Sequence, residues 1–309
     1  MKSHKAFQVS RRGYTVVELI VTLSIIGLLI SLLAPALQSA RESARKSACR
    51  NNLRQLALAV HQYESVYRSL PMAVIPSRAR TWNVEGLRFN AQLLPFLEQA
   101  SIAAALKTRD TRSLLTSFYA QYGTLIPEGL VVLPIMRCPS STMSLHAIDS
   151  AATGGGKLPA AVRGYANADY VAVAGPSGAF GMFPLLNNFT TPVRSMADVT
   201  DGLSNTLAIG EHSYPGRSGT QFPIWIAAYG FPHDSNFIDT HFRINCVDSF
   251  SGQFWATAQG NACALSLHPG ISQFAFGDGA VRSLSENIDQ RVYTLLGAIA
   301  DGEPVLLDF

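Results

Sequence analysis

The chain contains one long apolar segment near its N-terminus. Residues 19–37 (LIVTLSIIGLLISLLAPAL) carry no charge, and twelve of these nineteen residues are Leu, Ile or Val. As an α-helix this segment is about 28 Å long, which is enough to cross the hydrocarbon core of a bilayer. Transfer of its aliphatic side chains into lipid outweighs the cost of Glu18 at its edge. We therefore predict one membrane-spanning helix.

The charges around this segment predict its orientation. The first twelve residues contain Lys2, Lys5, Arg11 and Arg12 and no acidic residue. A basic flank stays in the cytoplasm, so we expect a single-pass protein of the inner (cytoplasmic) membrane, with its head in the periplasm or on the cell surface. The net charge is +3, and without these four residues 20 basic residues oppose 21 acidic ones. The exported part therefore lacks the positive charge expected of a nucleic-acid-binding protein.

Three kinds of export signal fit parts of this N-terminus. Ala34-Pro35-Ala36 resembles a secretory cleavage site, although the apolar segment exceeds the usual length of about 7 to 15 residues. Arg11-Arg12 resembles a twin-arginine signal, although such signals do not usually carry a carboxylate beside so apolar a segment. The third is residues 11–19 (RRGYTVVEL), where a short basic leader ends in Gly13 and is followed by an aromatic residue and then by Glu18.

This third pattern resembles the type IV prepilin signature. In that reading Gly13 precedes the cleavage site, Tyr14 is the new methylated N-terminus and Glu18 is the fifth mature residue. Pro35 is then the 22nd, where pilins and the pseudopilins of type II secretion commonly carry a helix-kinking proline. The resemblance implies that Glu18 neutralises the N-terminal amine of a neighbouring subunit, which gives an expensive membrane carboxylate a purpose. An ordinary anchor helix with an incidental acidic residue is the alternative.

The membrane helix is expected to continue as an amphipathic helix. Residues 38–67 contain no Pro or Gly, and their apolar side chains recur at steps of three and four residues. The apolar face that we expect to lie against a sheet consists of Leu53, Leu56, Ala57, Val60 and Tyr67. Basic side chains outnumber acidic ones just after the apolar segment, and we interpret them as a solvated face near anionic lipid head groups.

The rest of the chain has the pattern of an α+β domain rich in strands and loops. Residues 87–106 predict a short helix interrupted at Pro95, residues 111–122 predict another, and residues 204–211 (SNTLAIGE) predict a strand. The clearest β-hairpin joins residues 272–276 and 280–284 through Gly277-Asp278-Gly279. The expected organisation is a leader (1–13), a transmembrane helix (14–37), an amphipathic stalk (38–70) and a globular head (71–309).

Five short motifs, in order, resemble those of one large bacterial family of prepilin-like proteins. His268, nine further residues and Asp278-Gly279 reproduce its H-x9-DG signature. The other four motifs are residues 49–56 (CRNNLRQL), 93–99 (LLPFLEQ), 137–140 (RCPS) and 201–206 (DGLSNT). The domain common to this family has no known function. The resemblance implies a type IV pilin-like fold, in which a long N-terminal helix packs on an antiparallel sheet with a large β-rich, loop-rich head.

The four cysteines form an even set without a C-x-x-C pair, which argues against a zinc ribbon and allows two disulfides. Cys246 and Cys263 are 17 positions apart, and closing such a loop stabilises a fold by about 3 kcal/mol. The family resemblance places Cys49 and Cys138 at its motifs and implies that they pair across the junction between helix and sheet.

His268 and Asp278 allow two interpretations. If their side chains converge, Glu211-His212 or Asp201 could complete an oxygen and nitrogen shell for a metal. We favour the simpler interpretation, in which Asp278 supplies a turn and His268 forms a hydrogen bond in a buried loop, so we expect no cofactor and no resident metal. Calcium, which pilin-like relatives hold in C-terminal loops, stays open, although an EF-hand pattern is missing.

The sequence favours a structural protein over an enzyme, because it lacks a recognisable catalytic constellation in the head. We expect a type IV pilin-like or pseudopilin-like subunit whose partners are a prepilin peptidase, other pilin-like subunits and inner-membrane lipid. One alternative is a membrane-anchored binding module for polysaccharide or protein, with Trp225, Tyr229 and Trp255 as a sugar-stacking face, although most such aromatic residues are core. A second alternative is an exported metal-dependent hydrolase centred on His268.

The processing site gives a direct prediction. Gly13 is the residue of the leader that fits a prepilin peptidase, so mass spectrometry of the native protein should find N-methyl-Tyr14 at its start. Gly13→Ala should be partly processed, and bulkier residues at position 13 should block cleavage. A mature chain that starts at Leu37 would instead support the secretory signal.

Overall fold

The computed structural model describes residues 15–76, 86–108, 126–147, 164–176, 180–183, 193–213, 223–228, 237–246, 262–300 and 302. The helix predicted at residues 111–122 lies outside these ranges. The chain forms two compact units, Met1–Ala44 and Arg45–Phe309, and the first helix begins in one and ends in the other.

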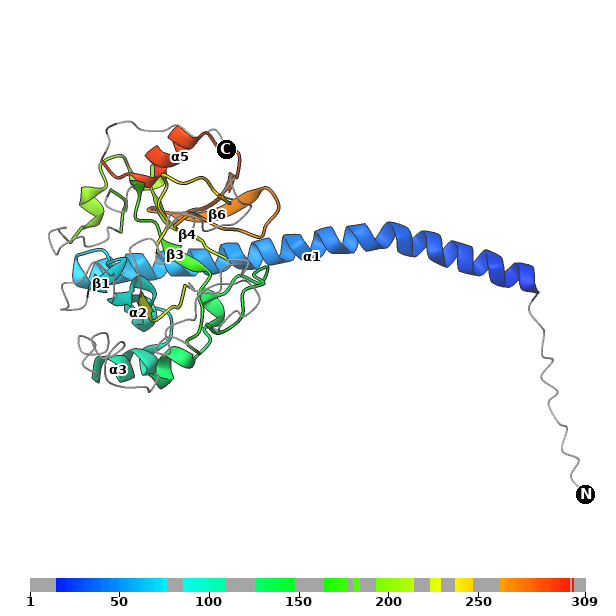
Figure 1. Cartoon of the computed structure of the whole chain (residues 1–309), viewed down its shortest axis with the longest axis horizontal. Helices are drawn as coiled ribbons and strands as arrows, with labels where there is room; N and C mark the ends of the chain where they lie inside the picture. The colour runs from blue at the N-terminus through cyan, green and yellow to red at the C-terminus, as the bar shows by residue number, and fades with distance from the viewer. Residues whose placement is uncertain are drawn as a thin grey trace, which may run out of the picture. The chain divides into compact units, whose positions relative to one another are not determined.

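The helix α1 (Val16–Tyr67) is continuous over 52 residues (Figure 1), so the apolar and amphipathic segments form one helix, as the sequence predicts. By length and composition it is able to cross a membrane, and the 18-residue window that meets this test is entirely unburied. The helix continues through Pro35. Because proline has no N–H, the carbonyl of Ser31 lacks its usual helical donor there.

The second half of α1 buries one face. Its buried residues are Cys49, Leu53, Leu56, Ala57, Ala59 and Val60, which are spaced as a helix contacting a core requires. Tyr67 is an exception to the predicted face, because it is 49% exposed. Its ring lies at the end of the helix, 4.5 Å from the ring of Tyr63 and 6.3 Å from that of Phe96.

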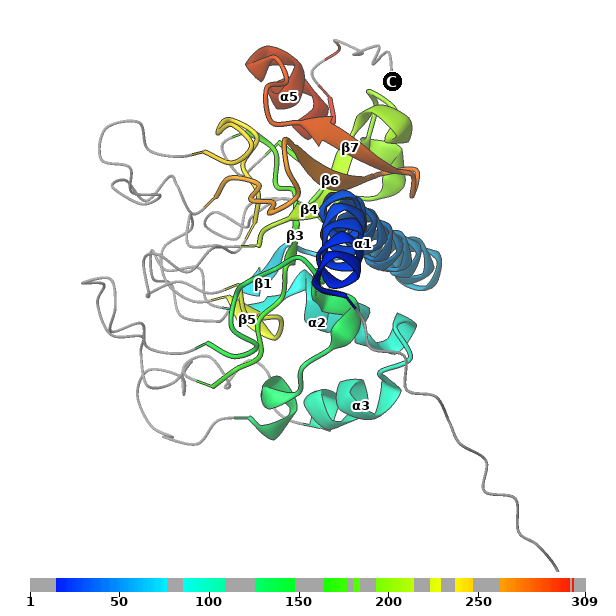
Figure 2. The ribbon, with the colours of Figure 1, turned by 90° about the vertical axis from the view of Figure 1, so that its right-hand side faces the viewer.

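A four-stranded antiparallel sheet has the order β3-β4-β6-β7, comprising β3 (Tyr170–Ala172), β4 (Leu207–Glu211), β6 (Ile271–Phe276) and β7 (Val281–Ser285). Alternate side chains of β6 point to opposite faces. Ala275 joins the cluster that contains the buried face of α1, whereas Phe274 packs with Tyr293 of α5 (Gln290–Gly297). The sheet therefore lies between α1 and α5 (Figure 2). This α+β architecture is the one predicted.

A smaller antiparallel sheet contains β1 (Val74–Pro76), β2 (Gly86–Arg88) and β5 (Ala227–Ala228). The segment predicted as an interrupted helix is divided into α2 (Phe89–Leu93), the 3-10 turn η1 (Leu94–Phe96) and α3 (Ala100–Thr108). Pro95 lies in η1, at the predicted interruption. The other named 3-10 turns are η2 (Pro127–Leu130), η3 (Pro134–Met136), η6 (Met196–Asp198) and η7 (Leu203–Asn205).

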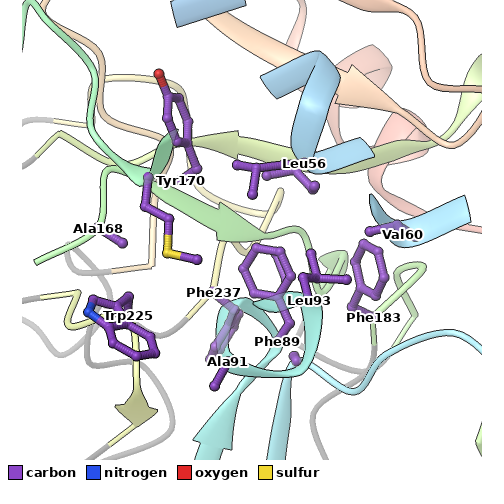
Figure 3. Close-up of a cluster of buried hydrophobic side chains, with 14 of the residues drawn as sticks. Leu56, Val60, Phe89, Ala91, Leu93, Ala168, Tyr170, Phe183, Trp225 and Phe237 are labelled. Atoms are coloured by element: carbon purple, nitrogen blue, oxygen red, sulfur yellow. The ribbon is translucent and has the colours of Figure 1, made fainter. Parts of the chain in front are cut away.

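The core between α1, α2 and β3 is aromatic (Figure 3). Leu56 and Val60 of α1 lie in one hydrophobic cluster with Phe89 and Phe183, whose rings stack 6.0 Å apart. Trp225 is fully buried, and its indole Nε1 donates to the carbonyl of Val131 at 2.9 Å. Trp225 is therefore a core residue and not part of a sugar-binding face. Tyr229 and Trp255 lie outside the described residues.

The hairpin of β6 and β7 is confirmed, with Ala275 opposite Val281 as the last pair before the turn. Gly279 has a φ of +83°, whereas Asp278 keeps a negative φ. Only Gly279 therefore needs the conformational freedom of glycine. In the tight two-residue turn that an Asp-Gly pair favours, both residues would have a positive φ. The Asp278 carboxylate accepts a hydrogen bond from the Ala280 N–H at 2.8 Å and lies 3.9 Å from Arg282.

Two substitutions separate the backbone role of this turn from its charge. Gly279→Val should lower the free energy of unfolding by about 1 to 3 kcal/mol, because a β-branched residue is strained at positive φ. Asp278→Asn should be almost neutral, since its amide oxygen still accepts from Ala280 and the lost ion pair is exposed. Thermal unfolding of the full chain in detergent measures both. Equal destabilisation by the two variants would contradict the conformational role.

Candidate functional site

The Glu18 carboxylate has a local contact within its own chain. Its carboxylate Oε2 accepts hydrogen bonds from the Thr15 backbone N–H at 2.8 Å and from the Thr15 hydroxyl at 2.9 Å. The Glu18 N–H in turn donates to the Thr15 hydroxyl at 3.3 Å. This reciprocal pair is a capping box, and the Thr-x-x-Glu pattern before an apolar run is the sequence signal for it.

The capping box gives the carboxylate a role within one chain, so its presence alone does not require a partner amine. Pro35 is exposed on α1. Gly13 and Tyr14 lie outside the described residues, and the cleavage and methylation assigned to them stay predictions.

The second group of predicted site residues meets inside the head. Cys49 comes from α1, Cys138 follows η3, Glu211 ends β4, and His268 lies in the turn before β6. All four residues are buried, and one ligand atom from each lies within 4.8 Å of the others. We call these four residues the Cys-Glu-His cluster. In the part of the chain that the structure describes, it is the one group of three or more such residues with this geometry.

The two cysteines of the cluster form a disulfide, with their Cα atoms 5.2 Å apart. The His268 Nε2 lies 3.5 Å from the Cys138 Sγ and 3.3 Å from the Glu211 Oε1. The other carboxylate oxygen, Glu211 Oε2, accepts from the backbone N–H of Gln273 in β6 at 3.0 Å. This contact fixes the carboxylate, so that Oε1 points at the imidazole and the sulfur.

A second charged pair lies beside the cluster. The Asp169 carboxylate accepts from the Cys138 backbone N–H at 2.8 Å and lies 3.1 Å from the Arg137 guanidinium. Burial raises the pKa of Asp169 to about 6, although Arg137 and the hydrogen bonds from Ser141 and Cys138 oppose the rise. Burial also raises the pKa of Tyr170 well above its usual value, and the negative charge of Glu211 adds to this effect.

The convergence of His268 with Asp278 does not occur, because His268 is fully buried whereas Asp278 is exposed at the hairpin turn. Asp201 and His212 are not in the cluster either. His212 follows Glu211 in the chain, but its Nδ1 forms a hydrogen bond with the carbonyl of Cys263 at 2.9 Å. Burial lowers the pKa of His212 to about 4. A metal shell of His268 and Asp278 is therefore excluded, whereas the expectation that Glu211 lies near His268 is correct.

The motifs that carried the family resemblance gather around α1. Asn52 of α1 donates to the carbonyl of Arg137 at 2.9 Å, next to the disulfide. Phe96 packs edge-on against Tyr63, with ring centroids 6.0 Å apart. A Cβ placed on Gly279 would lie 3.6 Å from the ring of His61. Residues 93–99 and 137–140 thus contact α1 directly, and Gly279 lies close to it.

The motif at residues 201–206 contacts the turn that contains Asp278 and Gly279. The N–H groups of Gly277 and Asp278 donate to the carbonyls of Thr206 and Leu203, at 2.8 and 3.1 Å. Arg282 donates to the carbonyl of Ser204 at 2.7 Å. The predicted strand at residues 204–211 accordingly starts only at Leu207, because Gly202, with a φ of +95°, leads into η7.

The second disulfide joins Cys246 and Cys263, with Cα atoms 6.2 Å apart, and no cysteine among the described residues is free. The Cys246–Cys263 bond is the pair expected from loop length, and the Cys49–Cys138 bond is the pair that the family resemblance implies. Nothing in the described chain brings a histidine and a carboxylate to this second disulfide as in the Cys-Glu-His cluster.

Comparison with known proteins identifies a family for this chain. Residues 38–291 match the family described as "Protein of unknown function (DUF1559)". The match begins just after the apolar segment and includes all four residues of the Cys-Glu-His cluster. No curated protein and no solved structure matches the chain significantly.

The two disulfides should differ in their contribution to stability. The Cys49–Cys138 bond joins positions 89 residues apart and the Cys246–Cys263 bond positions 17 apart. By loop-closure entropy, replacing the first pair with serine should cost about 4 to 5 kcal/mol and replacing the second about 3 kcal/mol. Denaturant unfolding of both double variants measures this order. Non-reducing peptide mapping that found four free thiols would refute both bonds.

Proposed function

The chain belongs to the DUF1559 family, whose function is unknown, and we propose that it is a pilin-like or pseudopilin-like structural subunit anchored in the inner membrane and not an enzyme. The observation that carries this proposal is the continuity of α1. Its first half is apolar and unburied, and its second half forms part of the core of an α+β head. In a subunit of this kind, the apolar half of one helix packs among neighbouring subunits in a membrane or filament. The other half of the same helix forms part of the head.

The N-terminal pattern supports the details of the proposal. A prepilin peptidase cuts after Gly13, the amine of Tyr14 is methylated, and other pilin-like subunits assemble with the exposed apolar half of α1. The H-x9-DG pattern of His268, Asp278 and Gly279 supports membership of the prepilin-like group within the family. In that group the chain is delivered to a periplasmic or surface filament, with its leader in the cytoplasm.

The burial of the cluster bears on the hydrolase alternative. His268 and Glu211 are inaccessible, with exposed fractions of 1% and 0%. A hydrolytic centre has to admit water and substrate, so this burial does not favour catalysis at His268. The buried Trp225 likewise gives no support to a sugar-stacking face.

The role of Glu18 can be tested with three variants that separate its charge from its capping bond. Glu18→Val removes both, Glu18→Gln keeps a side-chain oxygen that can cap the helix, and Thr15→Ala removes the capping hydroxyl but keeps the charge. If the carboxylate pairs with the amine of an adjoining subunit, the variants Glu18→Val and Glu18→Gln should both fail to assemble. The variant Thr15→Ala keeps the charge and should assemble. Membrane insertion and cleavage should continue in all three, because the two Glu18 variants lose a charge, which favours the bilayer, and Thr15→Ala loses only a hydroxyl.

Two measurements decide the outcome. Filament yield in sheared surface fractions reports on a pilus, and cross-linked oligomers in the membrane report on a short pseudopilus. Normal assembly of Glu18→Gln would show that capping suffices and that no amine is paired. Loss of assembly in Thr15→Ala alone would lead to the same conclusion.

A further inference from the structure

The Cys-Glu-His cluster contains the donor set of a metal site as well as a disulfide. Two thiolates, an imidazole and a carboxylate are the ligand types that Zn²⁺ takes in tetrahedral sites. The soft sulfur donors select zinc over calcium or magnesium, which prefer oxygen. We propose that, before Cys49 and Cys138 are oxidised, the cluster binds one Zn²⁺ through Cys49, Cys138, Glu211 and His268.

The spacing of the donors supports this proposal. Zinc bonds of about 2.3 Å to sulfur and about 2.0 to 2.2 Å to nitrogen and oxygen give tetrahedral edges of about 3.3 Å for N···O, 3.5 Å for S···N and 3.6 Å for S···O. The corresponding distances are 3.3 Å from His268 Nε2 to Glu211 Oε1, 3.5 Å from His268 Nε2 to Cys138 Sγ, and 3.9 Å from Cys138 Sγ to Glu211 Oε1. Two of these three distances match the tetrahedral edges, and the distance from sulfur to oxygen is about 0.3 Å longer. The fourth donor is the Cys49 sulfur, which has to move away from Cys138.

The surroundings of the cluster fit a structural zinc site. All four ligands are buried, and four protein ligands leave no open position, which is the pattern of structural rather than catalytic zinc. The Gln273 N–H holds the carboxylate through Oε2 and leaves Oε1 for the metal. A dication also offsets most of the charge of two thiolates and one carboxylate, which is costly to bury alone.

The zinc-bound and the disulfide-bonded forms of the cluster are chemically distinct. Zinc binding forms two Zn–S bonds and releases the two thiol protons, with no change in oxidation state. Disulfide formation removes two electrons and two protons and needs an oxidant. A newly made chain has thiols, so zinc binding requires no reductant. The disulfide links α1 to the loop after η3, whereas zinc would also link both to the sheet through Glu211 of β4.

The second cysteine pair provides a matched control. The full chain is made by cell-free synthesis into detergent micelles, with a phosphine reductant and Zn²⁺ present. Two double variants are compared. The variant Cys246→Ser/Cys263→Ser keeps the Cys-Glu-His cluster intact, whereas Cys49→Ser/Cys138→Ser keeps only the cysteine pair Cys246 and Cys263. After removal of free metal, the first variant should retain about one zinc per chain and the second almost none. Equal zinc in the two variants, or none in the first, overturns the proposal.

The ligands are identified on the zinc-loaded Cys246→Ser/Cys263→Ser protein itself. X-ray absorption at the zinc edge should find two sulfur neighbours and two nitrogen or oxygen neighbours, and any other count of sulfur contradicts the site. In the same background, His268→Ala and Glu211→Gln should each weaken zinc binding by more than about 100-fold. The exposed residues supply the controls His241→Ala and Glu98→Gln, which should leave zinc affinity unchanged. These results do not depend on assembly, so they are separable from the proposed function.

Discussion

Burial of one face of α1 is the interaction on which the rest of the head depends. Burying Leu53, Leu56 and Val60 contributes about 5 to 9 kcal/mol, which is similar to the whole stability of a typical domain. The helix therefore belongs to the core and is not a tether attached to a finished head. The disulfide of Cys49 and Cys138 adds a covalent link at the first buried turn of this face, so α1 stays bonded to the head even if its packing is lost.

The family motifs can be understood through this constraint. Residues 49–56 are the buried turns of α1, residues 137–140 supply the other half of the disulfide, and Phe96 packs at the far end of the helix. His268 completes the Cys-Glu-His cluster, and the Gly277–Gly279 turn bonds to the segment that contains η7. Most of these motifs therefore contribute to the packing of α1 in the head or to the hairpin beside it.

The sequence predicted the features that depend on local patterns. The apolar run and the periodicity of Leu53 and Leu56 predicted α1, and the alternation around Gly277-Asp278-Gly279 predicted the hairpin. The contacts of His268 were not predictable in this way, because its partners are distant in the chain and Asp278, its partner in the signature, points elsewhere. The strands of the smaller sheet are two or three residues long, too short for a pattern. The Thr-x-x-Glu pattern was sufficient to predict the capping box of Thr15 and Glu18, but the prepilin interpretation assigned Glu18 to a partner amine instead.

We infer that α1 and the sheet form one cooperative core. Hydrogen exchange of the full chain in detergent tests it directly, because amides that open in the same event share one free energy of opening. We expect equal free energies of opening for the amides of α1 around Leu56 and for those of β4 and β6, up to the global value. Exchange of the α1 amides at much lower free energy, with β4 and β6 still protected, would instead show that the head folds without the helix.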